Sequence, residues 1–413
     1  MLTKNFLSRR AKMRVLYHPD CLLHRTVELL GAKIIPALEC PERLDSVIVA
    51  LKETDGHELV IENYPTWESD EDIEWSEDNL IKWILKDTHD AGYLNHLMTV
   101  HKTWVTGDLI KEDEHVLPEC FRIPSVASGS STGDDPPLER PPPKDIYAKA
   151  GYYAFDMSTG IAKDTWTSTL ASANLAVRAA TYVMSPGARA SSVIALCRPP
   201  GHHCTSKLAG GYCYVNNAVV AVEAIRRRKR SITTPPERHG PDLSTTGPSC
   251  QPNIAILDLD FHHGNGTQDV FYHDPSVLYV SIHGRDEYPY YTGSESETGA
   301  GAGKGYNLNL PLPAGSSISQ YLEKLEMAVE RLVEFEPEYL IVSLGFDTFH
   351  LDPLGGFKID VEDYDDIARR IKGEERLKSV PGMILLEGGY VVEKLGECIV
   401  SFVRGWEGGV KSG

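Results

Sequence analysis

Two aspartates and two histidines follow an apolar run in the segment LDLDFHHGNGTQ, Leu257–Gln268. The residues before them, NIAIL, are short and aliphatic, which predicts a buried parallel strand. Charged side chains in such a strand are costly unless they are paired or bind a metal. In open α/β sheets, ligands bind beyond the carboxyl ends of the strands, which is where these residues fall. Asp258, Asp260 and His262 are therefore either a hydrogen-bonded polar network or ligands.

The spacing of three of these side chains suits a metal ion. Asp260 and His262 are two residues apart, so they share one face of an extended segment and can hold one ion. A third carboxylate, Asp347, follows another predicted strand in VSLGFDTF. Two oxygens and one nitrogen leave a fourth position open, which is typical of catalytic zinc, whereas magnesium and calcium prefer more oxygen ligands. From spacing alone, a buried salt-bridge network remains an equal alternative.

Three further side chains are suited to moving protons and stabilising charge. The adjacent pair His202–His203, in RPPGHH, can flank a metal and transfer protons for a bound water. Each imidazole needs a partner that fixes its tautomer, and Asp258 and Asn265 are the candidates. Tyr390, at the end of LLEGGY, can donate a hydrogen bond to a developing oxyanion. All of these residues lie just past predicted strands, so in a parallel sheet they would converge on one edge.

The elements that must position them alternate along the chain. This alternation predicts an α/β fold with a mostly parallel central sheet and helices on both faces. The predicted strands are Arg14–Tyr17, Ser192–Cys197, Asn253–Asp260, Val277–Gly284, Glu338–Gly345 and Gly382–Gly389. The predicted helices are Glu42–Glu53, Ser168–Val183, Asn217–Arg228, Ser319–Phe335 and Val361–Lys372.

The length of 413 residues and the 41% hydrophobic content allow a large core. We expect a flexible leader over residues 1–12 and one domain over 13–413. Two Ser-, Gly- and Pro-rich stretches, at about 115–144 and 231–252, are expected to be loop insertions into that domain.

Composition narrows the function classes. The net charge of −18 speaks against direct nucleic-acid binding and favours cationic substrates or basic protein tails. Eight cysteines without a CxxC pair favour an intracellular protein, cytoplasmic and/or nuclear, and no apolar run is long enough for a membrane span. The basic run RRRKR, Arg226–Arg230, is better explained as a solvated helix end than as a nuclear-targeting signal. The glycine-rich TGAGAGKG, Thr298–Gly305, predicts a turn rather than a phosphate loop.

Taken together, the motifs resemble those of the zinc-dependent deacetylases of the arginase–deacetylase superfamily. The chain is most similar to acetylpolyamine amidohydrolases and class II histone deacetylases, from Met13 onward, which implies a single-domain arginase/deacetylase-like fold with long loops around the active site. The motifs, in order, are HDAGYLNHL, AGYYAFD, RPPGHH, GGYCYVNNA, ILDLDFHHGNGTQ, YNLNLPLPAG, VSLGFDTF and LEGGY. GYYAFD and the Tyr212 of GGYCY favour the polyamine branch, and DPLGG, Asp352–Gly356, favours the class II histone deacetylases.

The resemblance also implies residue roles. Asp260, His262 and Asp347 would hold one Zn²⁺ per chain, His202 and His203 would handle protons, and Tyr390 would stabilise the transition state. Asp258 would orient His202, whereas Asn265 stands where class I enzymes carry Asp. A structural monovalent cation, K⁺, would lie beside the zinc at a site formed by Asp258, Asp260, His262, Ser281 and Ile282.

The implied reaction is hydrolysis of an N-acetyl amide, with an acetylpolyamine as the expected substrate and a class II protein-lysine (histone) deacetylase as the alternative. The partner would be a small cationic acetylated amine or an acetyl-lysine protein tail, and a homodimer is a candidate assembly. An arginase-like two-metal hydrolase would need more carboxylate ligands, and the complete zinc set argues against a non-enzymatic acetyl-lysine reader. The expected substrate-binding residues are Gly211, Tyr212, Glu28, Tyr290, Tyr291 and Leu354. Tyr147 and Leu354 stand where polyamine enzymes carry further acidic residues, so the anionic rim is expected to depend on Glu28.

Overall fold

The structure is a computed structural model, and it describes residues 12–54, 57, 59–63, 80–122, 141–185, 187, 192–233 and 251–408. The expected leader, apart from Lys12, and most of both expected insertions lie outside these residues. Among the described residues, no helix is both long and apolar enough to cross a membrane.

An eight-stranded sheet forms the centre of the molecule, and every strand pairing in it is parallel. The strand order is β4-β1-β5-β10-β9-β6-β7-β8, which confirms the predicted parallel α/β architecture. The strands are β1 (Arg14–Tyr17), β4 (Leu59–Ile61), β5 (Ser192–Ala195), β6 (Ile254–Asp258), β7 (Val277–Gly284), β8 (Asn307–Leu312), β9 (Tyr339–Leu344) and β10 (Gly382–Leu386). The central strands β6 and β10 are buried along their whole length, as their unbroken aliphatic sequences require.

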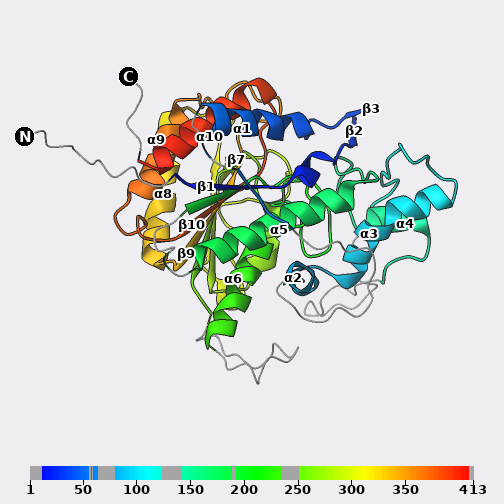
Figure 1. The fold of residues 1–413 in the computed structure, drawn as a ribbon, viewed down its shortest axis with the longest axis horizontal. Helices are drawn as coiled ribbons and strands as arrows, with labels where there is room; N and C mark the ends of the chain where they lie inside the picture. The colour runs from blue at the N-terminus through cyan, green and yellow to red at the C-terminus, as the bar shows by residue number, and fades with distance from the viewer. Residues whose placement is uncertain are drawn as a thin grey trace, which may run out of the picture.

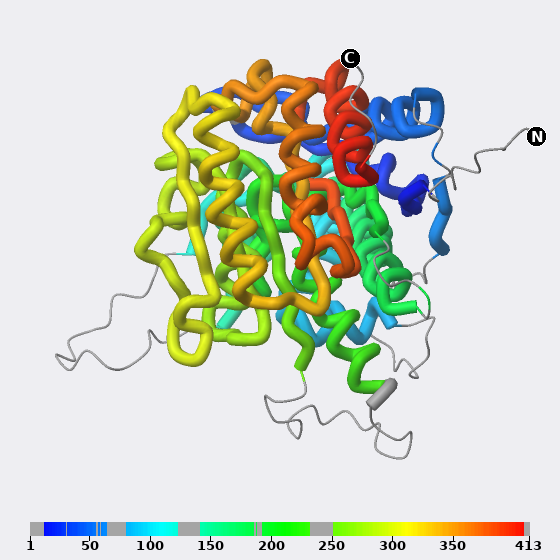
Figure 2. The backbone as a smooth tube through the Cα atoms, turned by 90° about the vertical axis from the view of Figure 1, so that its left-hand side faces the viewer, coloured from blue at the N-terminus to red at the C-terminus, as the bar shows by residue number. Residues whose placement is uncertain are grey.

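Helices cover both faces of this sheet (Figures 1 and 2). One layer contains α1 (Pro41–Glu53), α8 (Ile318–Phe335), α9 (Asp363–Gly373) and α10 (Val392–Trp406). The other contains α2 (Leu80–Thr88), α5 (Thr165–Val183), α6 (Asn217–Thr233) and α7 (Asn265–Phe271), and α3 (Ala91–Thr106) with α4 (Ile146–Tyr152) extends from its side. The helix α5 is buried on nearly all sides because small residues, mostly alanines, let α6 and the sheet approach closely.

Several elements were not predicted. The segment after the first strand, which carries Glu28, is an antiparallel hairpin of β2 (Val27–Leu30) and β3 (Lys33–Pro36). Among the described strands, β8 pairs with β7 alone, at the edge of the sheet. Its alternating sequence NLNLPL lacks the aliphatic run that identifies a central strand. The helices α2, α3, α4, α7 and α10 were also not predicted.

The strand register aligns the ends from which the loops with the chemical residues leave. Asp258, the last residue of β6, pairs with Ser281 of β7 and Ser343 of β9. In turn, Leu385 of β10 pairs with Ser343 and with Ala195 of β5. The loops after β5, β6, β9 and β10 therefore begin at the same edge of the sheet, as the sequence predicted.

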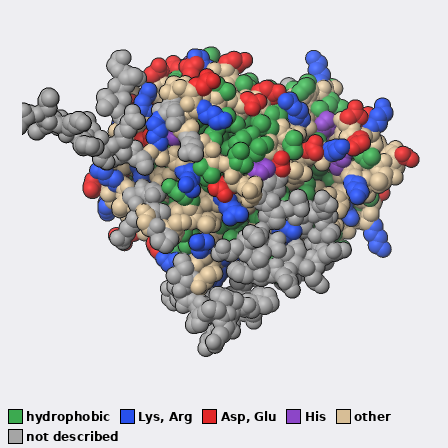
Figure 3. All heavy atoms as spheres, viewed as in Figure 1, with side chains coloured by type: hydrophobic (Ala, Val, Ile, Leu, Met, Phe, Trp, Pro, Cys, Tyr) green, Lys and Arg blue, Asp and Glu red, His purple; other side chains and the backbone are tan. Residues whose placement is uncertain are grey.

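Residues of the basic run at the end of α6 form ion pairs. Arg226 pairs with Asp274, Lys229 with Glu338, and Arg230 with Glu223. On the face shown in Figure 3, acidic and basic side chains of the described residues are interspersed, without a continuous basic stripe. Both observations agree with a solvated helix end.

Two smaller expectations can also be compared with the structure. TGAGAGKG contains one turn of 3₁₀ helix, Gly301–Gly303, which confirms the predicted turn. All seven cysteines in the described part of the chain are free thiols: Cys21, Cys40, Cys120, Cys197, Cys204, Cys213 and Cys398.

Candidate active site

Asp260, His262 and Asp347 meet at the carboxyl ends of β6 and β9, buried from solvent. His262 Nδ1 lies 3.2 Å from Asp260 Oδ1 and 3.0 Å from Asp347 Oδ2, and the candidate ligand atoms lie within 4.8 Å of one another. Glycine is required around them: a Cβ at Gly345 would lie 2.1 Å from Asp260 Oδ2, and one at Gly388 would lie 2.3 Å from Asp347 Oδ2.

This donor set fits a divalent cation. Backbone N–H groups anchor both carboxylates, from Phe261 to Asp347 Oδ1 at 2.8 Å and from Gly388 to Asp260 Oδ2 at 2.8 Å. Burial, together with the charge of Asp260, raises the pKa of Asp347. Two buried carboxylates in contact repel each other, and a bound cation would remove that repulsion. The mixed oxygen and nitrogen ligands are those that zinc accepts.

The histidine pair lies beside this cluster, with the partners expected from the sequence. His202 Nδ1 lies 3.1 Å from Asp258 Oδ2, and His203 Nδ1 lies 2.8 Å from Asn265 Oδ1. The two rings are 4.0 Å apart between centroids, and the His203 ring lies 6.0 Å from that of His262.

The environments of the two imidazoles push their pKa values in opposite directions. Burial alone would lower the pKa of His202, but the charges of Asp260 and Asp258 outweigh it and raise this pKa well above its ordinary value. Burial lowers the pKa of His203 well below its ordinary value, and the charges of His202 and His262 lower it further. The neutral Asn265 cannot reverse this effect, so His203 is the imidazole that is free to accept a proton.

Tyr390 closes the other side of the cluster. Its ring lies 5.7 Å from the ring of Tyr212, and the guanidinium of Arg43 lies over it at 4.9 Å. The Tyr390 N–H donates to Asp352 Oδ2 at 2.6 Å, and Arg43 Nε donates to the carbonyl of Gly389 at 2.5 Å. The segment that carries Tyr390 is thus held on both sides by side chains from other elements.

Two tyrosines, each hydrogen-bonded to a carboxylate, stand next to these residues. Tyr212 donates to Glu28 Oε2 at 2.8 Å, and burial raises the pKa of Glu28. Tyr288 donates to Asp156 Oδ2 at 2.6 Å, and its half-buried ring lies 5.0 Å from that of His203. Glu28 therefore comes from the β2–β3 hairpin into contact with Tyr212.

Gly211 allows its loop to pass close to the histidine pair. Its φ is +54°, and a Cβ there would lie 2.2 Å from Cδ2 of His203. The Gly211 N–H donates to Asp156 Oδ2 at 2.7 Å, so the same carboxylate holds Gly211 and Tyr288.

The other expected rim residues are less closely engaged. Tyr290 and Tyr291 are 64% and 92% exposed, and it is Tyr288 of the run EYPYY that packs on the histidines. Leu354 is half-buried, with its N–H bonded to Asp352. Tyr147 is on α4, where its ring packs against Trp104 at 5.0 Å. Substrate contacts of Tyr290, Tyr291 and Leu354 remain predictions.

The residues expected around a monovalent cation adjoin the metal cluster. Ser281 pairs with Asp258 in the sheet, and Ile282 follows it in β7. The Ser281 hydroxyl lies 2.9 Å from His283 Nδ1. A potassium ion at this position remains a prediction.

Four residues that hold the site together were not singled out from the sequence: Arg43, Asp156, Asp352 and Glu387. Tyr288 belongs to the run EYPYY, for which the sequence predicted an aromatic wall without deciding which ring forms it. Asp156 ends AGYYAFD, Glu387 is in LLEGGY and Asp352 begins DPLGG, so their motifs drew attention, but their contacts depend on tertiary structure. Only Arg43 lies outside every motif and the aromatic run, so the sequence offered no signal for it.

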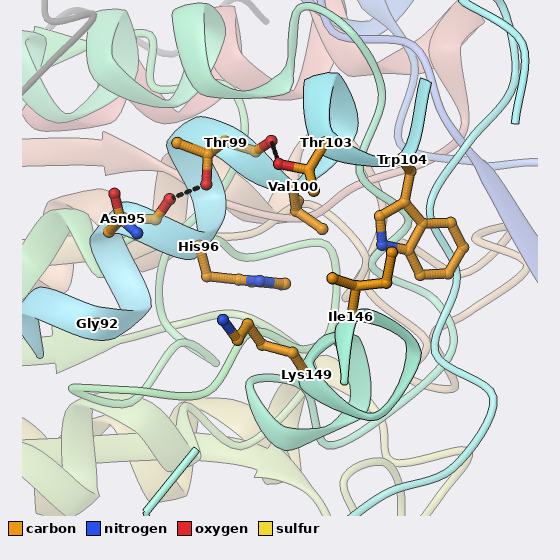
Figure 4. A pocket seen from close by; sticks show the side chains of 9 residues that line it. All are labelled: Gly92, Asn95, His96, Thr99, Val100, Thr103, Trp104, Ile146 and Lys149. Carbon is orange, nitrogen blue, oxygen red and sulfur yellow. Dashed lines mark hydrogen bonds between the residues drawn. The ribbon is translucent and has the colours of Figure 1, made fainter. Parts of the chain in front are cut away.

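A separate cavity lies between α3 and α4 (Figure 4). His96, Trp104 and Lys149 line it, and none of them belongs to the cluster described above. Burial lowers the pKa of His96 to about 3, so this imidazole is neutral.

Comparison with known proteins agrees with this geometry. The model of the histone deacetylase domain matches residues 37–235 and 242–406. The chain is 34% identical to "Acetylpolyamine amidohydrolase 1" of Pseudomonas aeruginosa, over 97% of this chain and 100% of the relative. It is 33% identical to "Histone deacetylase 4" of Caenorhabditis elegans, but over 59% of this chain and 27% of the relative.

Solved structures show the same fold. A crystal structure of acetylpolyamine aminohydrolase from Burkholderia pseudomallei superposes with a TM-score of 0.74 at 30% identity, covering 96% of this chain and 98% of that one. The chain therefore belongs to the histone deacetylase family and is a metal-dependent deacetylase.

Proposed function

We propose that the enzyme is a zinc-dependent amidohydrolase that removes acetyl groups from acetylpolyamines, with a catalytic domain over residues 13–413. The observation that carries the choice of substrate is the contact between Glu28 and Tyr212, next to Tyr390. A half-buried carboxylate at this position can pair with a secondary ammonium of the substrate. The full-length match to acetylpolyamine amidohydrolases supports the same substrate class.

In this proposal, Asp260, His262 and Asp347 hold the zinc, which when bound polarises the acetyl carbonyl and activates water. His203 Nε2 takes the proton of the attacking water and returns it to the leaving amine. His202, whose pKa is raised by the charges of Asp260 and Asp258, stabilises negative charge nearby. The Tyr390 hydroxyl donates a hydrogen bond to the oxyanion. A potassium ion at Asp258, Asp260, His262, Ser281 and Ile282 would support the zinc ligands.

Zinc dependence can be tested directly. Treatment with a chelator should abolish hydrolysis of an acetylated amine, and Zn²⁺ should restore it in proportion to the metal bound, measured by atomic absorption. Alanine at Asp260 should lower metal content, whereas alanine at His203 should retain the metal and lose turnover. Full activity in metal-free protein would exclude zinc catalysis.

The substrate can be tested by comparing kcat/KM for N-acetylputrescine and acetylspermidine with that for an acetyl-lysine peptide. Wild type should prefer the polyamines, and Glu28→Gln should lower kcat/KM for acetylspermidine by roughly 5- to 150-fold, since a charge-assisted hydrogen bond contributes about 1–3 kcal/mol. The peptide rate should change little.

Glu338→Gln is the matched control, because Glu338 pairs with Lys229 at the opposite end of β9 from the site. This variant should leave both rates unchanged. A wild type that prefers the peptide, with no effect of Glu28→Gln, would instead identify a protein-lysine deacetylase, the alternative favoured by the match to "Histone deacetylase 4". A homodimer and an intracellular location accompany this proposal as further predictions.

A further inference from the structure

Glu387 is a buried carboxylate that the proposed reaction does not use. It follows β10 directly and is inaccessible to solvent. Its Oε2 accepts hydrogen bonds from the N–H of Gly201 at 2.7 Å and of His202 at 3.3 Å. Its Oε1 has no hydrogen-bond partner within the described part of the chain. The side chain thus acts through one oxygen, and that oxygen faces the loop of the histidine pair.

The backbone of Glu387 is fixed independently of this side chain. Its N–H donates to the carbonyl of Leu344 in β9 at 2.9 Å, and its carbonyl accepts from Arg43 at 2.5 Å. The next residue, Gly388, donates to the metal ligand Asp260. Glu387 therefore offers its carboxylate from a rigid position between the metal ligands and Tyr390.

A charged carboxylate is energetically unfavourable at this buried position. Burial raises the pKa of Glu387 to about 7; the charge of His202 lowers this pKa, whereas the negative charges of Asp258 and Asp260 raise it. What the side chain contributes is an acceptor for two backbone N–H groups, which would be destabilising if buried without a partner.

We propose that Glu387 is a positioning residue, whose carboxylate oxygen ties the His202–His203 loop to the strand end that carries Tyr390. The tie sets the distance between the imidazole that takes the proton and the hydroxyl that stabilises the oxyanion. It depends on the place of the acceptor oxygen and not on its charge. This inference rests on the roles proposed above for His203 and Tyr390.

Three substitutions of Glu387 distinguish the effect of its hydrogen-bond acceptor from the effect of its negative charge. Glu387→Gln keeps an oxygen in place and removes the charge, so kcat should stay within about 3-fold of wild type. Glu387→Asp keeps the charge but withdraws the oxygen by one methylene, and Glu387→Met removes the acceptor. Both should lower kcat by roughly 10- to 100-fold, as misplacement by about 1 Å does, with KM within about 3-fold and metal content unchanged.

Hydrogen exchange supplies a readout that does not depend on activity. By mass spectrometry, amides in the segment 199–205 should exchange faster in Glu387→Asp and Glu387→Met, and at the wild-type rate in Glu387→Gln. Asp365→Asn is the matched control: it alters a buried carboxylate that joins Arg369 to Arg404, away from the site, and should leave kcat and this segment unchanged.

The outcomes distinguish this inference from the proposed function. A wild type without deacetylase activity would count against the proposed function, and the exchange data would still decide the role of Glu387. A Glu387→Asp protein with wild-type kcat and exchange would overturn the inference. So would a Glu387→Gln protein as impaired as Glu387→Asp, because charge would then be the operative property. If Glu387→Met does not fold, the Gln and Asp variants are sufficient.

Discussion

At the scale of single residues, the two imidazoles differ in their partners, a carboxylate for one and an amide for the other. Asp258 gives His202 a charged partner, whereas Asn265 gives His203 a neutral one. Because the rings are only 4.0 Å apart, a charge on His202 also disfavours a second charge on His203. The two environments therefore favour the charged form of His202 and the neutral form of His203, and a general base must begin in its neutral form.

The role of Tyr390 as oxyanion donor can be tested by substituting this single residue. Tyr390→Phe removes one hydrogen-bond donor and keeps the ring under Arg43, so kcat should fall by roughly 10²–10³ with little change in KM. Tyr306→Phe, at the amino end of β8, is the control and should have wild-type kinetics. A loss expressed mainly in KM would mean that Tyr390 only binds substrate.

At the scale of elements, rigid strands and helices supply the frame and loops supply the chemistry. The β2–β3 hairpin projects from the body of the molecule and brings Glu28 to Tyr212 (Figure 1). The helix α8 packs on β7, beneath the loops of the site, and begins with a capping box. The Ser317 hydroxyl accepts from the N–H of Gln320, and the Gln320 side chain accepts from the N–H of Ser317.

This cap predicts a stability change without a change in chemistry. Ser317→Ala should lower the free energy of unfolding by about 1 kcal/mol, measured by urea titration, and should leave kcat/KM unchanged. The control is Ser319→Ala, an exposed position inside the first turn of α8, which should be neutral or slightly stabilising. Equal losses in the two variants would show that the cap contributes nothing specific.

At the scale of the whole molecule, the parallel sheet gathers four loops at one edge and leaves many polar groups buried around them. Three buried histidines outside the metal cluster, His24, His89 and His96, have pKa values lowered by burial to about 3. In the unfolded chain an imidazole takes up a proton near pH 6.5. Because only the unfolded state binds these protons between about pH 6.5 and 3, the stability of the fold is present above this window and falls as pH drops through it.

His89 allows the cleanest test, because burial is the only cause of its lowered pKa. Between pH 7 and pH 5, wild type should lose about 2 kcal/mol more unfolding free energy than His89→Gln. Urea titrations at pH 7, 6 and 5 measure both slopes. Parallel slopes for the two proteins would show that His89 is already protonated in the folded state.

The sequence by itself determined the class of fold and the chemical groups. Its unbroken aliphatic strands can be buried only in a sheet covered on both faces, and the position of Asp260, His262 and Asp347 just past such strands is enough to predict that they meet. The motifs also identified the partners of the histidine pair, because Asp258 and Asn265 lie in the same short segment as two of the metal ligands. A local sequence pattern is enough to predict a contact when the residues concerned directly follow neighbouring strands of a parallel sheet.

The tertiary structure alone decided how these groups are held. Arg43 contacts Gly389 and the ring of Tyr390, although it lies in α1, 346 residues before Gly389 in the chain. Asp156 joins Gly211 to Tyr288, and Glu387 joins the histidine loop to the end of β10. Likewise, Tyr288 rather than Tyr290 or Tyr291 packs on His203, because the chain turns at Tyr290 with a φ of +68° and leaves the later rings exposed. Such contacts depend on the directions of loops whose ends are fixed by different strands, and no local sequence period encodes those directions.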